Sequence, residues 1–253
     1  MAGVKLIASL IGITPAPVKR LLRSNRHVAR LMSKVAHASI REETALSVGG
    51  GLRMWFGPDT PLVYATHHDM ERDVLDALLS RLAPGMTAVD VGAHMGYHAL
   101  HMARAVGATG RVFAFEPDPK SCQRLRRNVT LNDADNITVQ ECAVSDSRGH
   151  VKFTGGGAAE SHVGEGDLIV PAVTLDAAVD SAQLVKVDVE DHEVAVLRGA
   201  VRLVNEVRPA WLIEVHSPQS LAGCKALLHG YKLSTIDGLG ENPFVRGHLL
   251  AIP

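Results

Sequence analysis

The chain has 253 residues, of which 46% are hydrophobic and 21% are charged, and its formal net charge is −1. This balance excludes a disordered chain, and the length suits one α/β domain with an appended segment. Cys122, Cys142 and Cys224 form no C-x-x-C pair, so we expect buried thiols in a reducing cytosol rather than disulfides or a zinc knuckle. No apolar run approaches the roughly 20 residues that span a bilayer, and the N-terminus does not resemble a cleaved secretory signal.

Residues 1–45 are predicted to form a basic amphipathic helical extension, with the main domain at 46–253. The first 41 residues hold eight of the 26 Lys and Arg and no acid, which leaves 18 basic against 27 acidic residues, a net charge of −9, for the remainder. Two interpretations stay open: the helix packs on the main domain, or residues 15–37 dock on an anionic membrane surface or a partner. The expected location is therefore the cytoplasm, with peripheral contact to the inner face of the membrane as the alternative.

The next elements in chain order predict a Rossmann-like, doubly wound, mostly parallel sheet. A hairpin is expected at 46–56 and a helix at 69–82, and the tail pairs 231–236 with 248–252 as an antiparallel hairpin. Between 151 and 167 we expect a strand followed by a Gly-rich loop, either a lid or a surface insertion. The core alternates strands at 87–91, 111–115, 137–144, 184–189 and 210–215 with helices at 97–106, 120–131, 194–204 and 221–228.

The glycine turn after the first core strand is the strongest functional signal. Asp90 lies near the end of the strand, and Gly92 and Gly96 follow in a turn that opens a helix. Such a turn lets backbone N–H groups approach a nucleotide-like cofactor. The dinucleotide fingerprint G-x-G-x-x-G is broken, however, because His94 occupies the second glycine position. An acid at Asp90 suits the ammonium of S-adenosylmethionine better than a pyrophosphate.

Three further strand ends carry polar side chains. Glu116 ends the second core strand about 20 residues after the turn, where such folds place the acceptor of ribose hydroxyls. Asp188 and Glu190 end the fourth strand, and His216, a candidate general base, ends the fifth. We expect Asp188 and Glu190 to orient the acceptor. No metal is predicted, although carboxylates clustered with Asp191 leave a divalent cation as an alternative.

The chain resembles the FkbM-type methyltransferases among the class I S-adenosylmethionine-dependent enzymes. The resemblance runs through Asp90-Val-Gly-Ala-His-Met-Gly96, Gly110-Arg-Val-Phe-Ala-Phe-Glu-Pro117, Asn128, Ala143-Val-Ser-Asp146, Val173-Thr-Leu-Asp176, Lys186-Val-Asp-Val-Glu190, Leu197-Arg-Gly-Ala200, Arg208-Pro209 and Ile213-Glu214.

The resemblance implies a seven-stranded sheet with a reversed last strand. It also implies transfer of a methyl group, usually to a hydroxyl of a sugar, glycolipid or natural product. Matching positions assign Asp90, Gly92 and Gly96 to the methionine end of the cofactor, Glu116 to the ribose, and Ala143 with Val144 to the adenine.

Two positions depart from the family pattern. His94 stands where the family commonly has Asn, so we keep it with the cofactor-binding residues as a replacement polar contact. Asp191 stands where the family has Gly and adds a carboxylate near the expected acceptor pocket. The identity of the acceptor is therefore less transferable than that of the cofactor.

Two other classes of function remain open from the sequence: a nicotinamide-dependent oxidoreductase, against which the missing second glycine argues, and a non-catalytic cofactor-binding module. A nucleic-acid partner is not expected, because the main domain is acidic and only 4% of the chain is aromatic. The partner expected is instead a small-molecule or glycolipid acceptor.

Overall fold

A computed structural model describes residues 42–57, 72–155, 162–236 and 247–253. The chain divides into two compact units, Met1–Met70 and Glu71–Pro253. In the first unit, β1 (Thr44–Gly49) and β2 (Leu52–Phe56) form the predicted antiparallel hairpin. The proposed extension at 1–45 lies almost wholly outside the described residues, so it and its membrane contact stay predictions. Within the described ranges, no helix has both the length and the apolar character needed to cross a bilayer.

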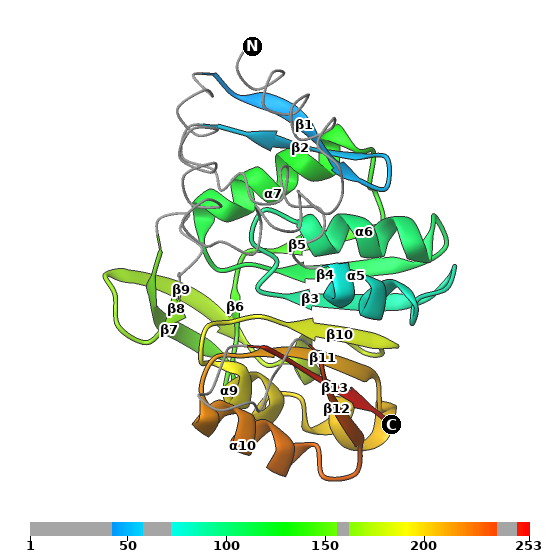
Figure 1. Ribbon diagram of the computed structural model, residues 1–253. Coiled ribbons are helices and arrows are strands. Elements are labelled where there is room, and N and C mark those ends of the chain that lie inside the picture. The colour runs from blue at the N-terminus through cyan, green and yellow to red at the C-terminus, as the bar shows by residue number, and fades with distance from the viewer. Residues whose placement is uncertain (1–41, 58–71, 156–161, 237–246) are drawn as a thin grey trace, which may run out of the picture. The chain divides into compact units, whose positions relative to one another are not determined.

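The second unit is built on a seven-stranded sheet with the strand order β12-β13-β11-β10-β3-β4-β5 (Figure 1). The five strands from β11 to β5 are parallel, and β13 runs antiparallel to both β11 and β12. This confirms the mostly parallel sheet with a reversed last strand. The strands are β3 (Thr87–Val91), β4 (Arg111–Phe115), β5 (Ile137–Gln140), β10 (Leu184–Val187), β11 (Ala210–Val215), β12 (Lys232–Ile236) and β13 (Gly247–Ile252).

Helices cover this sheet, with α5 and α6 packed together and α6 against β3 and β4, while α9 and α10 pack together on β11 (Figure 1). Asp118 caps α7 by accepting the Ser121 N–H, and Ser217 caps α10 by accepting the Ser220 N–H. A proline follows each cap, at the position where its missing N–H costs nothing. The helices are α5 (Arg72–Leu79), α6 (Tyr97–Val106), α7 (Pro119–Leu131), α8 (Leu175–Ala178), α9 (Glu193–Arg198) and α10 (Pro218–Leu227).

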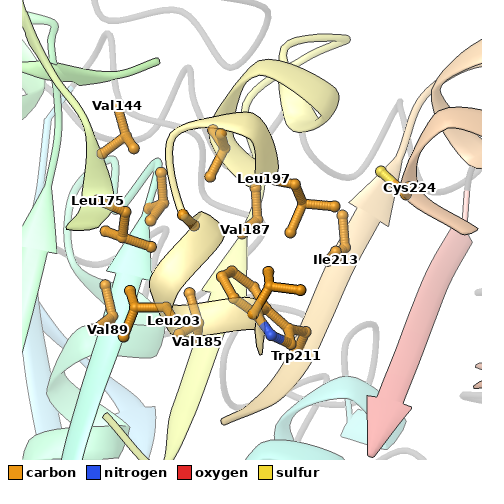
Figure 2. Close-up of a cluster of buried hydrophobic side chains, with 14 of the residues drawn as sticks. Val89, Val144, Leu175, Val185, Val187, Leu197, Leu203, Trp211, Ile213 and Cys224 are labelled. Carbon is orange, nitrogen blue, oxygen red and sulfur yellow. The ribbon is translucent and has the colours of Figure 1, made fainter. Parts of the chain in front are cut away.

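The main hydrophobic core lies on one face of β3, β10 and β11. Val185 and Val187 alternate with Lys186 along β10, and Trp211 and Ile213 alternate with Leu212 along β11. Figure 2 shows these apolar side chains with Leu197 of α9 and Cys224 of α10. Because strand side chains alternate between faces, Asp90, Lys186 and Glu214 fall on the opposite face. The three cysteines are buried and unbridged, as predicted.

The prediction of one strand over 137–144 is wrong, because the segment divides between two sheets. β5 ends at Gln140, and after Glu141 and Cys142 the short strand β6 (Ala143–Val144) joins a second, four-stranded sheet. That sheet has the order β6-β9-β7-β8, with β7 at Gly149–Thr154, β8 at His162–Val163 and β9 at Leu168–Val173. The apolar pattern continues through the break because Cys142, Ala143 and Val144 are buried as well. Residues 156–161 of the predicted loop lie outside the described residues.

The prediction of one helix over 194–204 is also wrong. Helix α9 ends at Arg198, and a π-helical turn, η1, covers Leu203–Val207. Gly199 follows the last residue of α9, and only glycine fits there because a Cβ would lie 2.0 Å from the Ser145 carbonyl oxygen. The carboxylate of Asp176 then accepts the N–H groups of Arg202 at 2.7 Å and Leu203 at 2.9 Å, which starts the second turn separately.

Candidate active site

The carboxyl ends of four parallel strands meet at one edge of the main sheet. In the strand register, Val91 pairs with Phe115 and with Val187, and Val187 pairs with Ile213. The residues that follow these positions therefore stand at the same level, and this brings Gly92, Glu116, Asp188 and Glu214 together. Ligands of open α/β sheets bind at such an edge.

The glycine turn after β3 is pressed against the neighbouring strand ends. The N–H groups of Gly92 and Ala93 donate to the Phe115 carbonyl oxygen at 2.9 and 3.0 Å. Gly92 has φ +80°, and a Cβ there would lie 1.8 Å from the Asp188 carbonyl oxygen. A residue larger than glycine would force β3 and β10 apart, so this close approach explains the glycine.

His94 and Glu116 are joined through the backbone. The His94 N–H donates to Glu116 Oε2 at 2.7 Å, and the Asp118 N–H donates to Glu116 Oε1 at 2.9 Å. Burial outweighs these bonds and raises the pKa of Glu116 to about 7. His94 has φ +49°, in the left-handed region where Asn and His are both enriched. The backbone conformation at this position therefore suits His as well as Asn.

Asp90 places a buried carboxylate on the face opposite the main core. It is fully buried, and neither of its oxygens has a hydrogen-bond partner among the described residues. The Lys186 ammonium, itself only 2% exposed, lies 3.6 Å from Asp90 Oδ1 and 3.4 Å from Asp188 Oδ2. A buried carboxylate with unsatisfied oxygens at this edge is suited to an ammonium group of a ligand.

Ala143 and Val144, predicted to border the adenine, already have buried side chains. Val144 belongs to the main hydrophobic cluster with Phe115, whereas Ala143 packs in a smaller cluster with Phe153. The chain passes here from one sheet to the other, and the Ser145 N–H donates to the Val173 carbonyl oxygen at 2.9 Å. A ligand would meet the backbone of these residues rather than their side chains.

His216 stands among four carboxylates at the ends of β10 and β11. Its Nε2 lies 3.3 Å from Glu190 Oε2, 3.8 Å from Asp188 Oδ1 and 4.0 Å from Glu214 Oε1. Its Nδ1 lies 2.6 Å from Glu193 Oε1. The side chain of His216 is only 5% exposed. The structure thus brings together the three residues predicted from the sequence, His216, Asp188 and Glu190.

Two of the carboxylates around His216 were not predicted. Glu214 lies on β11 among apolar residues, so its place on a buried strand was a signal available in the sequence. Glu193 is fully buried in the first turn of α9, where an acid ordinarily indicates only a favourable helix start. Its carboxylate also accepts the Ser220 hydroxyl and the Asp191 N–H, and nothing in the sequence indicates these contacts.

The residues that could bind a divalent cation differ from the carboxylates that the sequence indicated. One ligand atom each from Asp188, Glu214 and His216 lie within 4.8 Å of one another, which suits a metal with mixed oxygen and nitrogen ligands. Asp191 is exposed, and its φ of +69° lies in the left-handed region that glycine adopts most readily. Among the described residues, Glu214 rather than Asp191 therefore joins Asp188 and His216 in this candidate ligand set.

Comparisons with known proteins agree with this architecture. A structure of methyltransferase FkbM from Methylobacillus flagellatus KT has a TM-score of 0.51 at 18% identity, covering 72% of this chain and 58% of that chain. A putative rRNA methylase from Clostridium thermocellum has a TM-score of 0.52 at 14% identity, covering 72% and 95%. The strand order and these neighbours define the fold as that of the class I methyltransferases.

Sequence comparisons identify the family within the class I methyltransferases. The family described as "Methyltransferase FkbM domain" matches residues 90–235, more than half of the chain. Hexuronic acid methyltransferase AglP from Haloferax volcanii is 30% identical over 174 residues, which cover 65% of this chain and 70% of that protein. A protein-L-isoaspartate O-methyltransferase from Ignicoccus hospitalis is 30% identical over 109 residues, covering 42% and 52%. The chain belongs to the FkbM methyltransferase family, whose methyl donor is S-adenosylmethionine.

Proposed function

We propose that the protein transfers the methyl group of S-adenosylmethionine to a hydroxyl of a sugar, glycolipid or natural product. The observation that carries this proposal is the arrangement at the sheet edge. The imidazole of His216 lies among carboxylates at the end of β10, the strand that pairs with β3 and therefore lies next to the glycine turn. The likeness to a hexuronic acid methyltransferase supports a sugar acceptor.

The cofactor is assigned to the ends of β3 and β4. Asp90 would bind the ammonium of the methionine portion, with Gly92, His94 and Gly96 supplying the turn around it. Glu116 would accept the ribose hydroxyls with the lone pairs that its two backbone donors leave. The backbone of Ala143 and Val144 would border the adenine.

In the reaction, the acceptor oxygen attacks the methyl carbon as the carbon–sulfur bond breaks. The sulfonium becomes a neutral thioether, S-adenosylhomocysteine, and the hydroxyl proton passes to His216 Nε2. Asp188 and Glu190 orient the hydroxyl, and their charges stabilise the imidazolium that forms. The protein mainly supplies alignment and a base, because the leaving group is already activated.

The charges of the site favour a hydroxyl acceptor over a carboxylate. Four carboxylates lie within 4.0 Å of a ring nitrogen of His216, with Lys186 beside Asp188. An anionic oxygen brought to this place would be repelled, whereas a neutral hydroxyl can donate its hydrogen to the imidazole. On a hexuronic acid we therefore expect a ring hydroxyl, not the carboxyl group, to be methylated.

Labelled S-adenosylmethionine tests the acceptor. The protein is incubated with the methyl glycosides of a hexose and a hexuronic acid, and with lipid and sugar extracts, and the labelled product is identified. We expect an alkali-stable methyl ether. A methyl ester as sole product would overturn the proposal of a hydroxyl acceptor. Full turnover in a His216→Ala variant would overturn the assignment of His216 as the base. Activity that survives EDTA would remove the cation alternative, and loss restored by Mg²⁺ would establish it.

Calorimetric titration tests the cofactor assignment. Asp90→Asn should lower affinity for S-adenosylhomocysteine about 10- to 100-fold, because a charge-assisted contact to the ammonium is lost. Its affinity for 5′-methylthioadenosine, which lacks the amino-acid portion, should change less than about threefold on the same reasoning. Equal losses for both compounds would contradict the assignment of Asp90, and binding of NAD in place of both would contradict the class of cofactor.

A further inference from the structure

We infer that Glu193 is a positioning residue that sets the tautomer and orientation of His216. The inference rests on the proposed function in that His216 is the base, but Glu193 touches neither cofactor nor acceptor in that scheme. Glu193 Oε1 lies 2.6 Å from His216 Nδ1, the shortest of the contacts between His216 and the four carboxylates.

The chemistry of this contact determines which nitrogen carries the hydrogen. A carboxylate oxygen only accepts hydrogen bonds, so Nδ1 is the donor to Glu193. In the neutral ring, a hydrogen on Nδ1 leaves Nε2 as the basic nitrogen. Nε2 is the atom that faces Asp188 and Glu190, where the acceptor hydroxyl is proposed to bind. Without Glu193, the carboxylates around Nε2 would favour the hydrogen there and leave Nε2 unable to take a proton.

Glu193 is itself held in place. It is fully buried, and its second oxygen accepts the hydroxyl of Ser220 in α10, while Oε1 also accepts the Asp191 N–H at 3.0 Å. Glu190 and Asp191 precede it with φ of +48° and +69°, two successive non-glycine residues in the left-handed region. Such strain persists only where surrounding contacts determine the backbone, and the bond to Glu193 is one of them. The contact between Glu193 and His216 thus depends on the turn between β10 and α9.

Two substitutions separate the roles of Glu193. Glu193→Gln keeps a carbonyl oxygen that can accept from His216 Nδ1 and from the Asp191 N–H, but it removes the charge. Glu193→Leu removes both the acceptor and the charge. Glu206→Gln, an exposed acid in the η1 turn, is the matched control for an acid-to-amide change.

Nitrogen-15 NMR of the full chain with S-adenosylhomocysteine reads the tautomer directly, with the His216 signal assigned by its loss in His216→Gln. In the neutral form of the ring, we expect the hydrogen on Nδ1 in the unmodified protein and in Glu193→Gln. We expect it to move to Nε2 in Glu193→Leu. A neutral ring with its hydrogen on Nε2 in the unmodified protein would overturn the inference, and that measurement needs no variant to fold.

Kinetics on the acceptor identified above give the second readout. We expect kcat to fall about tenfold in Glu193→Gln and about 100-fold or more in Glu193→Leu, because general base catalysis contributes rate factors of about 100 or more. KM should stay within about twofold of its value in the unmodified protein. An unchanged kcat in both variants, with only a lower melting temperature, would show a structural role alone. Full activity of His216→Ala would instead defeat the proposed base, whatever the tautomer, so the two failures are distinguishable.

Discussion

The proposed cofactor side of the sheet edge, at the ends of β3 and β4, is built differently from the proposed acceptor side, at the ends of β10 and β11. On the cofactor side, backbone N–H groups of Gly92, Ala93 and His94 are bound to the next strand and to Glu116. On the acceptor side, the contacts of His216 are between ionisable side chains. The turn that is fixed by backbone contacts has no room for a Cβ at Gly92, whereas the arrangement around His216 depends on the identity of its neighbouring side chains.

The largest effect should follow from breaking the backbone contact of the cofactor side. In Gly92→Ala the new methyl group would lie 1.8 Å from a backbone oxygen, so we expect a loss of at least about 4 kcal/mol in the free energy of unfolding. The control is Gly85→Ala, also at positive φ, where the methyl group would meet only Thr109 at 3.7 Å. It should lose about 1 to 2 kcal/mol. Equal losses in urea unfolding would contradict the importance of the contact with β10.

Glu116 should make stability depend on pH. Because its pKa rises from 4.5 to about 7, the folded protein holds this proton more tightly than the unfolded chain does. The stability it contributes is present below pH 4.5 and is lost as pH rises through about 7, by up to about 3 kcal/mol. As pH rises through this range, the unmodified protein should therefore lose up to about 3 kcal/mol in free energy of unfolding relative to Glu116→Gln, whose amide does not titrate. Parallel pH curves for the two proteins would refute the shift.

A smaller effect is expected where α7 holds the glycine turn. Asn128 is fully buried, and its side-chain amide donates to the Met95 carbonyl oxygen at 2.9 Å. Asn128→Ala should cost about 2 kcal/mol of stability and weaken binding of S-adenosylhomocysteine several-fold. Asn136→Ala is the control, because Asn136 bonds to Ala103 and Gly107 at the other end of α6. It should cost similar stability, and weakened binding in both variants would argue against a local effect on the turn.

The smallest effect should come from the acceptor side. Asp191→Gly places a glycine at φ +69° and removes a negative charge, so we expect a gain of about 1 kcal/mol in stability. Asp133→Gly relieves a similar φ of +50° away from the site and should gain about half as much. A thermal shift assay would compare them. A loss of stability in Asp191→Gly would show that its carboxylate makes a favourable interaction.

The sequence predicted strands well where one strand stays in one sheet. The bounds of β3, β4 and β11 match the predicted ranges, because each is a mostly apolar run that ends at a glycine turn or at a polar residue. The break at Glu141 and the strand β9 were missed, because apolar alternation does not reveal which sheet a strand joins. The end of α9 was missed because it depends on the approach of Gly199 to Ser145, which lies far away in the sequence.

The candidate site was predictable only in part, for a related reason. Asp90, Glu116, Asp188 and His216 are found from the sequence because a strand end places a polar residue at the functional edge. Glu193 is the first residue of α9, and its contacts with α10 and with the end of β11 hold it in the interior. Those contacts join residues more than 20 positions apart, so local pattern does not contain them.

The buried lysine of β10 has a thermodynamic consequence for the order of binding. Lys186 lies within 3.6 Å of Asp90 on one side and within 3.4 Å of Asp188 on the other. A cationic ligand group that reaches Asp90 repels this ammonium and favours its pairing with Asp188. Occupancy of one ligand site should therefore alter affinity at the other, and such linkage is reciprocal. The binding of the two substrates is then energetically coupled across a single strand, and we expect the affinity for each to depend on whether the other is bound.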